Sequence, residues 1–400
     1  MKETRAEDRF MVSILADLTD VKRSAKAGLK IAEQGRTLDW DYLVRKMSDE
    51  GVLFLFFYYI HHLRLQDRLP AGLVDVLSVE YLASLRRNII ACTMLKPVFE
   101  MLKEHRIPFI VLKGIALAEL VYPGLGMRGM SDTDILVKKG DMLRVEACLS
   151  ALGYSPRDSS VALAIENPEG YLASLDYRKD DGSLPNIHVH WHPVNTSVPA
   201  YMFAGRIDPG RLWERALTAT VANAEVRVLC PEHQVIYLCE HALRINHSFD
   251  RLILMYDLCY VIETYRDEID WGFIVEEARR FNVSKFVFLS LAIVQHYTSR
   301  IVPEEVMSKL RSENLTFGEE LFLGSQLSNH RFRGSSIFVY LAMNNGFAEK
   351  CRFLFRTFFP PPQILMQRRY ARHVEFGASF YTHRAWEVLS HPFRIYRRNR

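Results

Sequence analysis

Two aspartates one residue apart, Asp132 and Asp134, are the residues of this chain best placed to do chemistry. Residues i and i+2 of a β-strand point to the same face, so a strand would project both carboxylates together. Two adjacent carboxylates repel each other unless a cation lies between them. Oxygen ligands of this kind suit Mg²⁺, which takes one or two protein carboxylates together with substrate phosphates. The pair therefore predicts a Mg²⁺ site, with Mn²⁺ as the alternative ion.

A place for phosphate precedes this pair in the chain. The apolar run Phe109–Leu112 has the length of a buried strand, and Gly114 follows it at a close turn. We expect a helix to begin at this turn and to offer unpaired N–H groups and its positive dipole end to phosphate. Lys113 and Arg128 supply cationic partners for phosphate oxygens. A phosphate site followed by a paired-acid strand is what metal-assisted nucleotidyl transfer needs.

The ordered motifs of this stretch carry a family resemblance. They are Lys113-Gly114, Tyr122-Pro123, Arg128 and the run Ser131–Val137, which reads SDTDILV. Together they resemble an uncharacterised bacterial nucleotidyltransferase-like family of the polymerase-beta-like superfamily. The resemblance implies an α+β fold, with a small mixed sheet flanked by helical regions. It implies an enzyme that transfers an NMP from an NTP to a hydroxyl acceptor. The residues it places at the nucleotide are Lys113, Gly114, Arg128 and Ser131, beside the catalytic Asp132 and Asp134.

The superfamily's third carboxylate, carried on a later strand, is replaced in this chain. The strand predicted at Asn186–Trp191 has His188 at that position, and the following His190 fits the resemblance. A neutral imidazole can bind a metal or accept a proton, but it supplies no negative charge. His188 is therefore predicted as a metal ligand or as the base, and His190 as a further ligand. Asp176, on the predicted partner strand, is an alternative third acid.

The alternating histidines His188, His190 and His192 leave other interpretations open. Two imidazoles at i and i+2 of a strand can bind one transition metal, as in a zinc hydrolase. All three can equally be polar side chains on the open face of a sheet. A further alternative is a protein that keeps the nucleotide pocket, has lost turnover, and acts by binding or regulation, since fold alone does not settle function.

The sequence predicts four regions, whose helices and strands must position these residues. These are a helical N-terminal region at 1–106, a transferase core at 107–215, a helical C-terminal domain at 216–359 and a basic, aromatic-rich tail at 360–400. Asp39-Trp40-Asp41 predicts a helix start, and Ala71–Arg106 predicts two helices. In the second helical region His241, Arg251 and Asp257 are candidates to contact nucleotide or acceptor. Alternatively they form a polar cluster that holds helices together.

Composition indicates a globular protein that can bury a large core. Of the 400 residues, 49% are apolar and 24% charged, and the net charge of +4 does not mark the whole chain as a nucleic-acid binder. The N-terminus has no apolar signal-peptide segment, and the longest apolar runs fall short of the roughly 20 residues that span a bilayer. We therefore expect a cytoplasmic protein without a transmembrane segment. The six cysteines lack CxxC spacing and predict buried free thiols.

The tail has a composition of its own. Residues 351–400 contain ten Arg and two Glu, interleaved with Phe, Tyr and Trp. Such a segment can bind an anionic membrane surface or nucleic acid. The alternative is a basic end that packs its aromatic rings on the body and leaves its arginines in solvent.

Overall fold

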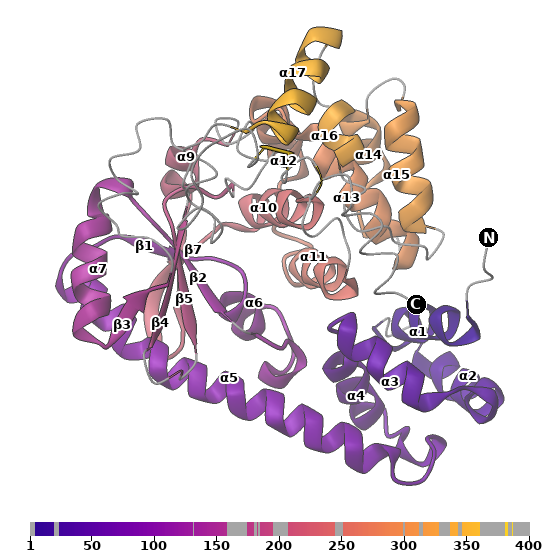
Figure 1. Ribbon diagram of the computed structural model, residues 1–400. Coiled ribbons are helices and arrows are strands. Elements are labelled where there is room, and N and C mark those ends of the chain that lie inside the picture. Colours follow the sequence, from indigo (N-terminus) through magenta and orange to yellow (C-terminus); the bar gives the residue numbers. More distant parts are fainter. Residues whose placement is uncertain are drawn as a thin grey trace.

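A mixed β-sheet flanked by helices forms the framework of the molecule (Figure 1). The computed structural model describes residues 5–19, 24–130, 132–157, 174–179, 182, 185–194, 207–244, 251–298, 301–311, 315–327, 337–342, 346–360, 381–382 and 386. Figure 1 shows the N-terminal and C-terminal helices on the same side of the sheet, and the long helix α5 runs below from the N-terminal helices to the sheet. The α+β class predicted from the sequence is confirmed.

Seven strands among the described residues form one sheet in the order β3-β4-β5-β2-β1-β7-β6. Their bounds are β1 Phe109–Val111, β2 Asp132–Val137, β3 Tyr154–Pro156, β4 Ser174–Lys179, β5 Asn186–His190, β6 Leu217–Val221 and β7 Ala224–Val228. Strand β2 is antiparallel to β1 and parallel to β5, and β1 is parallel to β7. The predicted first strand, the acid-bearing strand and the histidine strand therefore lie side by side.

The two faces of β2 and β5 have different surroundings. Ile135 of β2 and Val189 of β5 pack with α5 (Leu73–Glu104) and α7 (Met142–Ala151) in one hydrophobic cluster. Leu136 belongs to a second cluster, which contains residues of the N-terminal and C-terminal helices. Because side chains alternate along a strand, Asp132 and Asp134 share the face of Leu136. The acids and histidines therefore face the helical regions.

The N-terminal region consists of helices that lead to the first strand. They are α1 Ala6–Thr19, α2 Ser24–Gln34, α3 Trp40–Asp49, α4 Leu53–His62 and α5 Leu73–Glu104, with short 3₁₀ turns at Gly35–Thr37 and Gln66–Arg68. As predicted, Asp39 begins α3, and its carboxylate accepts a hydrogen bond from the Tyr42 N–H at 2.9 Å. The two helices predicted between 71 and 106 are one helix. Pro97 is tolerated inside α5 because it is exposed, so the carbonyl it leaves unpaired can reach water.

The C-terminal half is helical and packs on the sheet. Its helices are α9 Pro209–Glu214, α10 Pro231–Leu243, α11 Leu252–Thr264, α12 Trp271–Arg280, α13 Ser284–Tyr297, α14 Glu304–Leu310, α15 Phe317–Leu327, α16 Ile337–Ala342 and α17 Phe347–Phe358. The sheet continues past residue 215, the predicted end of the core, so the predicted helical region 216–359 begins with two strands. Strands β6 and β7 form a hairpin through Ala222 and Asn223, whose φ angles are 52° and 55°. Strand β7 pairs with β1 on the side opposite β2.

The two helical regions contact each other directly. The Glu50 carboxylate accepts a hydrogen bond from the Leu252 N–H at 2.9 Å, and its carbonyl accepts one from the Ile253 N–H at 3.1 Å. The hydroxyls of Tyr59 and Tyr260 lie 2.9 Å apart. None of the described helices has the length and hydropathy to cross a membrane. The cysteines are free thiols, as expected; five are buried, but Cys351 is exposed.

Candidate functional site

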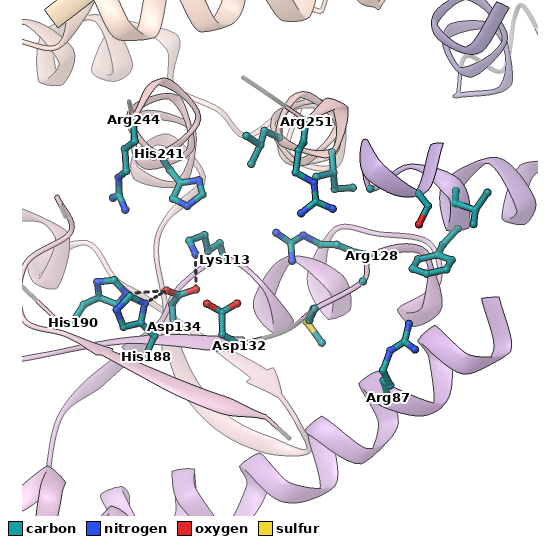
Figure 2. A pocket seen from close by; sticks show the side chains of 18 residues that line it. Arg87, Lys113, Arg128, Asp132, Asp134, His188, His190, His241, Arg244 and Arg251 are labelled. Atoms are coloured by element: carbon teal, nitrogen blue, oxygen red, sulfur yellow. Dashed lines mark hydrogen bonds and ion pairs between the residues drawn. The ribbon is translucent and has the colours of Figure 1, made fainter. Parts of the chain in front are cut away.

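A pocket of about 510 Å³ lies where the sheet and both helical regions meet (Figure 2). Its charged and imidazole-bearing lining residues are Arg87, Lys113, Arg128, Asp132, Asp134, His188, His190, His241, Arg244 and Arg251. We call the part formed by Lys113, Asp132, Asp134, His188 and His190 the sheet end. We call the part formed by Arg87, Arg251 and Gly51 the helical end. Figure 2 shows the two histidines at the left of the pocket, Arg251 at its top and Arg87 at its lower right.

The register of β2 and β5 brings Asp134 and the two histidines together. In this parallel pair Asp134 is the partner of His188, and the next residue on the same face of β5 is His190. The Oδ1 atom of Asp134 lies 2.8 Å from Nε2 of His190 and 3.4 Å from Nδ1 of His188. His188 therefore occupies the place opposite the second aspartate at which a third acid was expected.

Asp134 is a buried carboxylate with an opposite charge beside it. Lys113 donates a hydrogen bond from Nζ to Oδ2 of Asp134 at 2.6 Å, so the lysine and the histidines use different oxygens. Burial alone would raise the pKa of Asp134, but Lys113, His188 and His190 hold it well below its usual value. Burial alone would lower the pKa of Lys113, but Asp134 raises it above its usual value. The pair is therefore ionised in the folded protein.

The two histidines differ in burial and in partners. Burial and the neighbouring His188 lower the pKa of His190 to about 3, so His190 is neutral at pH 7. Its Nε2 donates to the ionised carboxylate, and its buried Nδ1 has no hydrogen-bond partner among the described residues. His188 is 25% exposed, and its Nε2 lies 2.8 Å from Oγ of Ser174 on β4. That hydroxyl can donate or accept, so it can support either tautomer of His188.

Asp134, His188 and His190 form a donor group that one metal ion can occupy. One ligand atom from each residue lies within 4.8 Å of the others, and two of the separations are 2.8 and 3.4 Å. Atoms that each lie about 2.1 Å from one ion are about 3.0–3.4 Å apart. The 3.4 Å separation fits this range, whereas the 2.8 Å contact is a hydrogen bond that would have to lengthen, with loss of the Nε2 proton of His190, for both atoms to bind an ion. One carboxylate and two imidazoles suit Mn²⁺, Fe²⁺ or Zn²⁺ better than Mg²⁺. Asp132 lines the same pocket but lies outside this group.

Arg128, predicted as a phosphate partner, is anchored by Asp257 of α11. Its Nε and Nη2 donate to the two oxygens of Asp257 at 2.7 and 2.8 Å. Tyr122 donates to the same carboxylate at 2.7 Å, and Asn88 donates to the Arg128 carbonyl at 2.8 Å. Burial alone would lower the pKa of Arg128, but Asp257 raises it, so the guanidinium stays charged. Asp257 thus belongs to a buried polar cluster that holds helices together, which was one of the two expectations for it.

Other predicted residues are placed individually. Gly114 has a φ of 62° before α6 (Ile115–Leu120), a conformation that favours glycine. Asp176 lies 3.6 Å from a nitrogen of Arg157 and 3.3 Å from one of Arg178, outside the pocket and the metal group. Nδ1 of His192 accepts from the Val194 N–H and Nε2 donates to the Ile207 carbonyl, so His192 is structural. Ser131 lies outside the described residues.

Two cationic residues of the pocket were not predicted from the sequence. Arg244 is buried at the end of α10, where Nη2 donates to Glu240 at 2.7 Å and to the Pro193 carbonyl at 2.6 Å. The Glu240–Arg244 spacing of four residues on a helix is the signal that could have indicated this pair. Arg87 lies on α5 and reaches the pocket (Figure 2), but nothing in the sequence separates it from the adjacent Arg86.

Comparison with known proteins assigns the chain to a family. Residues 36–299, about two thirds of the chain, match a family model described as uncharacterised nucleotidyltransferase. The match includes the sheet and the helices that line the pocket. Searches of curated proteins and of solved structures give no match. The matched share of the chain shows that this protein belongs to the uncharacterised nucleotidyltransferase family.

Proposed function

We propose that this protein transfers an NMP from an NTP to a hydroxyl group, on a polymerase-beta-like fold, with a divalent ion at the sheet end. The observation that carries the proposal is the ionised, buried Asp134, with His188 and His190 on one of its oxygens and Lys113 on the other. A metal-binding group beside cations in one pocket suits a triphosphate. Membership of a nucleotidyltransferase family supports the same reaction.

The proposed reaction is one displacement at phosphorus. The acceptor oxygen forms a bond to the α-phosphorus, the bond from that phosphorus to the pyrophosphate oxygen breaks, and the hydroxyl proton passes to a base. His188 is the proposed base or third ligand, because it is 25% exposed whereas His190 is 1% exposed. A bound ion would neutralise charge that develops on the phosphate oxygens. The residues proposed to bind the phosphates are Lys113, Gly114, Arg128 and Ser131.

The ion is proposed to be Mg²⁺ or Mn²⁺, held by Asp134, His188 and His190 with Asp132 beside them. The two imidazoles favour Mn²⁺, and we expect it to bind about tenfold more tightly than Mg²⁺. His188→Asp restores a third carboxylate, so this variant should narrow the difference between the two ions. Calorimetric titration of each ion into the metal-free protein measures both affinities. Equal Mn²⁺ affinity in the wild type and in His188→Gln would remove His188 from the ligand set.

Nucleotide binding is the first test of the function. Calorimetry with ATP, GTP, CTP and UTP, with and without Mg²⁺ or Mn²⁺, should show metal-dependent binding of at least one NTP. Asp132→Ala/Asp134→Ala should lose it, whereas Asp176→Asn, on a neighbouring strand outside the pocket, should keep it. Pyrophosphate release with candidate acceptors then measures turnover. Absence of binding by the wild-type protein with every NTP and both ions would contradict the proposal.

The alternative on the same fold is a nucleotide-binding regulator without turnover. The observation that favours it is the histidine at the place of the third acid, which adds no negative charge. This alternative predicts tight NTP binding and no pyrophosphate release with any acceptor. Recovery of pyrophosphate release in His188→Asp would identify the histidine as the cause of the lost turnover.

A second candidate function concerns α17, which lies beyond the family match. This helix buries Phe353 and Thr357 and exposes Phe347 and Phe355, at 84% and 58%. Arg352 and Arg356 are also exposed. An exposed apolar face flanked by cations fits an anionic membrane surface. Co-sedimentation with vesicles containing phosphatidylserine should fall with salt and in Phe347→Asp/Phe355→Asp. Binding to RNA but not to vesicles would support the nucleic-acid alternative for residues 351–400.

A further inference from the structure

Two arginines of the helical end line the pocket without an acidic partner. Arg87 on α5 and Arg251, which precedes α11, make no ion pair within the described part of the chain. Figure 2 shows both guanidinium groups directed toward the interior of the pocket from separate helical regions. An exposed charge without a partner is common on a surface, but two such charges that face one cavity favour a bound anion.

Arg251 is held in this orientation by its surroundings. Its Nε donates to the carbonyl of Asp49 at 3.1 Å, which leaves the Nη groups for other partners. A Cβ atom at Gly51 would lie 2.7 Å from Nη2 of Arg251, so the absence of a side chain there gives the guanidinium its place. Gly51 also has a φ of 73°, which disfavours any other residue. The backbone of residues 49–51 therefore fixes an arginine fork at the pocket wall.

The remaining cations of the pocket already have carboxylate partners. Lys113 bonds to Asp134, Arg128 to Asp257 and Arg244 to Glu240. The positive charge left unmatched is therefore concentrated at the helical end. Figure 2 shows Arg251 and Arg87 on opposite sides of Arg128, which Asp257 already fixes.

We propose that the helical end binds a phosphate group of the acceptor substrate while the NTP occupies the sheet end. The inference rests on the proposed function and names the substrate class: a hydroxyl compound that also carries a phosphate monoester. A phosphate monoester carries a charge of about −2 near pH 7, and a charged guanidinium is a suitable partner for its oxygens. Arginine forks bind phosphate oxygens in pairs, and this geometry selects phosphate over neutral acceptors.

The test is calorimetric titration of glycerol 3-phosphate into the full chain, saturated with Mn²⁺ and the α,β-methylene analogue of the NTP that binds. The probe should bind to this complex, whereas glycerol should not. Arg87→Gln and Arg251→Gln should each weaken probe binding about tenfold and change the affinity for the analogue less than twofold. Arg251→Lys keeps the positive charge but lacks the two-pronged guanidinium, so its affinity for the probe should lie between those of the wild type and Arg251→Gln. Arg86→Gln, the adjacent α5 residue outside the pocket lining, is the matched control.

The outcomes separate this inference from the proposed function. If the probe competes with the analogue, or if both arginine variants weaken the analogue instead, the arginines serve the triphosphate and the inference is overturned. If the analogue binds normally and the probe does not bind, the inference fails while the proposed function stands. If the analogue fails to bind, the proposed function falls, and Arg251-dependent binding of the probe to the chain alone still supports a phosphate site.

Discussion

The two ends of the pocket differ in how their charges are stabilised. At the sheet end Asp134 is 1% exposed, and Lys113, His188 and His190 all contact its carboxylate. At the helical end Arg251 is exposed, and a single backbone carbonyl holds its guanidinium. The first arrangement is part of the folded core, because an unpaired carboxylate there would be costly. The second leaves its charge available to a ligand.

This difference suggests that the sheet end carries out catalysis and that the helical end recognises the substrate. The sheet supplies the acid and the imidazoles from two adjacent strands whose backbone pairing fixes their spacing. The helical regions supply Arg87 and Arg251, whose charges have no carboxylate partner among the described residues. We therefore expect substitutions at the sheet end to damage turnover and stability together. Substitutions at the helical end should alter the choice of substrate alone.

The largest effect is expected for Asp134→Asn. The amide cannot neutralise Lys113 or a bound ion, so pyrophosphate release should fall by about 1000-fold, equivalent to roughly 4 kcal/mol of transition-state stabilisation. Steady-state kinetics with the NTP that binds and its acceptor measure this loss. Asp176→Asn should lose less than twofold, because its carboxylate is paired with arginines outside the pocket. Turnover near the wild-type level in Asp134→Asn would contradict the assignment of catalysis to the sheet end of the pocket.

The next effect concerns the buried pair between Arg128 and Asp257, which ties the pocket to α11. Asp257→Asn leaves the Arg128 guanidinium buried without a counter-charge, and the free energy of unfolding should fall by about 3 kcal/mol. Urea denaturation measures it. Glu263 lies on the same helix as Asp257, and Glu263→Gln, which breaks an exposed pair with Arg266, should cost less than about 0.5 kcal/mol. A similar loss in both variants would show that burial does not decide the cost of breaking these pairs.

Local sequence signals were sufficient to predict the centre of the fold. The apolar run before Gly114, the strand that carries the two aspartates and the helix start at Asp39 are confirmed, because each depends on neighbouring residues. Two helices were predicted where α5 is a single helix, and Pro97, normally a helix breaker, is tolerated inside it at an exposed position. The hairpin of β6 and β7 was missed because its place at the edge of β1 depends on pairing between residues far apart in sequence.

The site shows the same limit. Alternation along one strand predicted that His188 and His190 share a face, but their approach to Asp134 depends on the register between β2 and β5. The partner of Arg128 lies 129 residues away in the chain, on a helix whose packing no local pattern specifies. Arg87 and Arg251 reach one pocket only because the two helical regions meet at residues 49–51.

A smaller effect should appear in the pH dependence of stability. The pKa of His190 is about 3 in the folded protein against 6.5 for a free histidine, so the unfolded chain binds this proton first as pH falls. The metal-free wild type should therefore lose up to about 2 kcal/mol between pH 6.5 and 5 through this residue. His190→Gln should lack this part of the loss. The contributions of the other buried histidines are the same in both proteins, so they cancel when the free energies of unfolding are subtracted. Urea denaturation in EDTA at several pH values measures the free energy of unfolding of both proteins. If the difference between them does not change with pH, His190 is exposed to solvent.

The smallest expected effect belongs to the helical end and gives the sharpest contrast. Arg87→Gln and Arg251→Gln remove exposed charges that have no ion-pair partner among the described residues, so the free energy of unfolding should change by no more than about 0.5 kcal/mol. Urea denaturation measures this change, and Asp257→Asn, measured in parallel, shows the size of a large loss. A loss above about 1 kcal/mol would mean that Arg251 joins the helical regions through Asp49 and is needed for the fold. Unchanged stability, together with weaker binding of a phosphate-bearing probe, would assign these arginines to the substrate, because only a ligand then uses their charge.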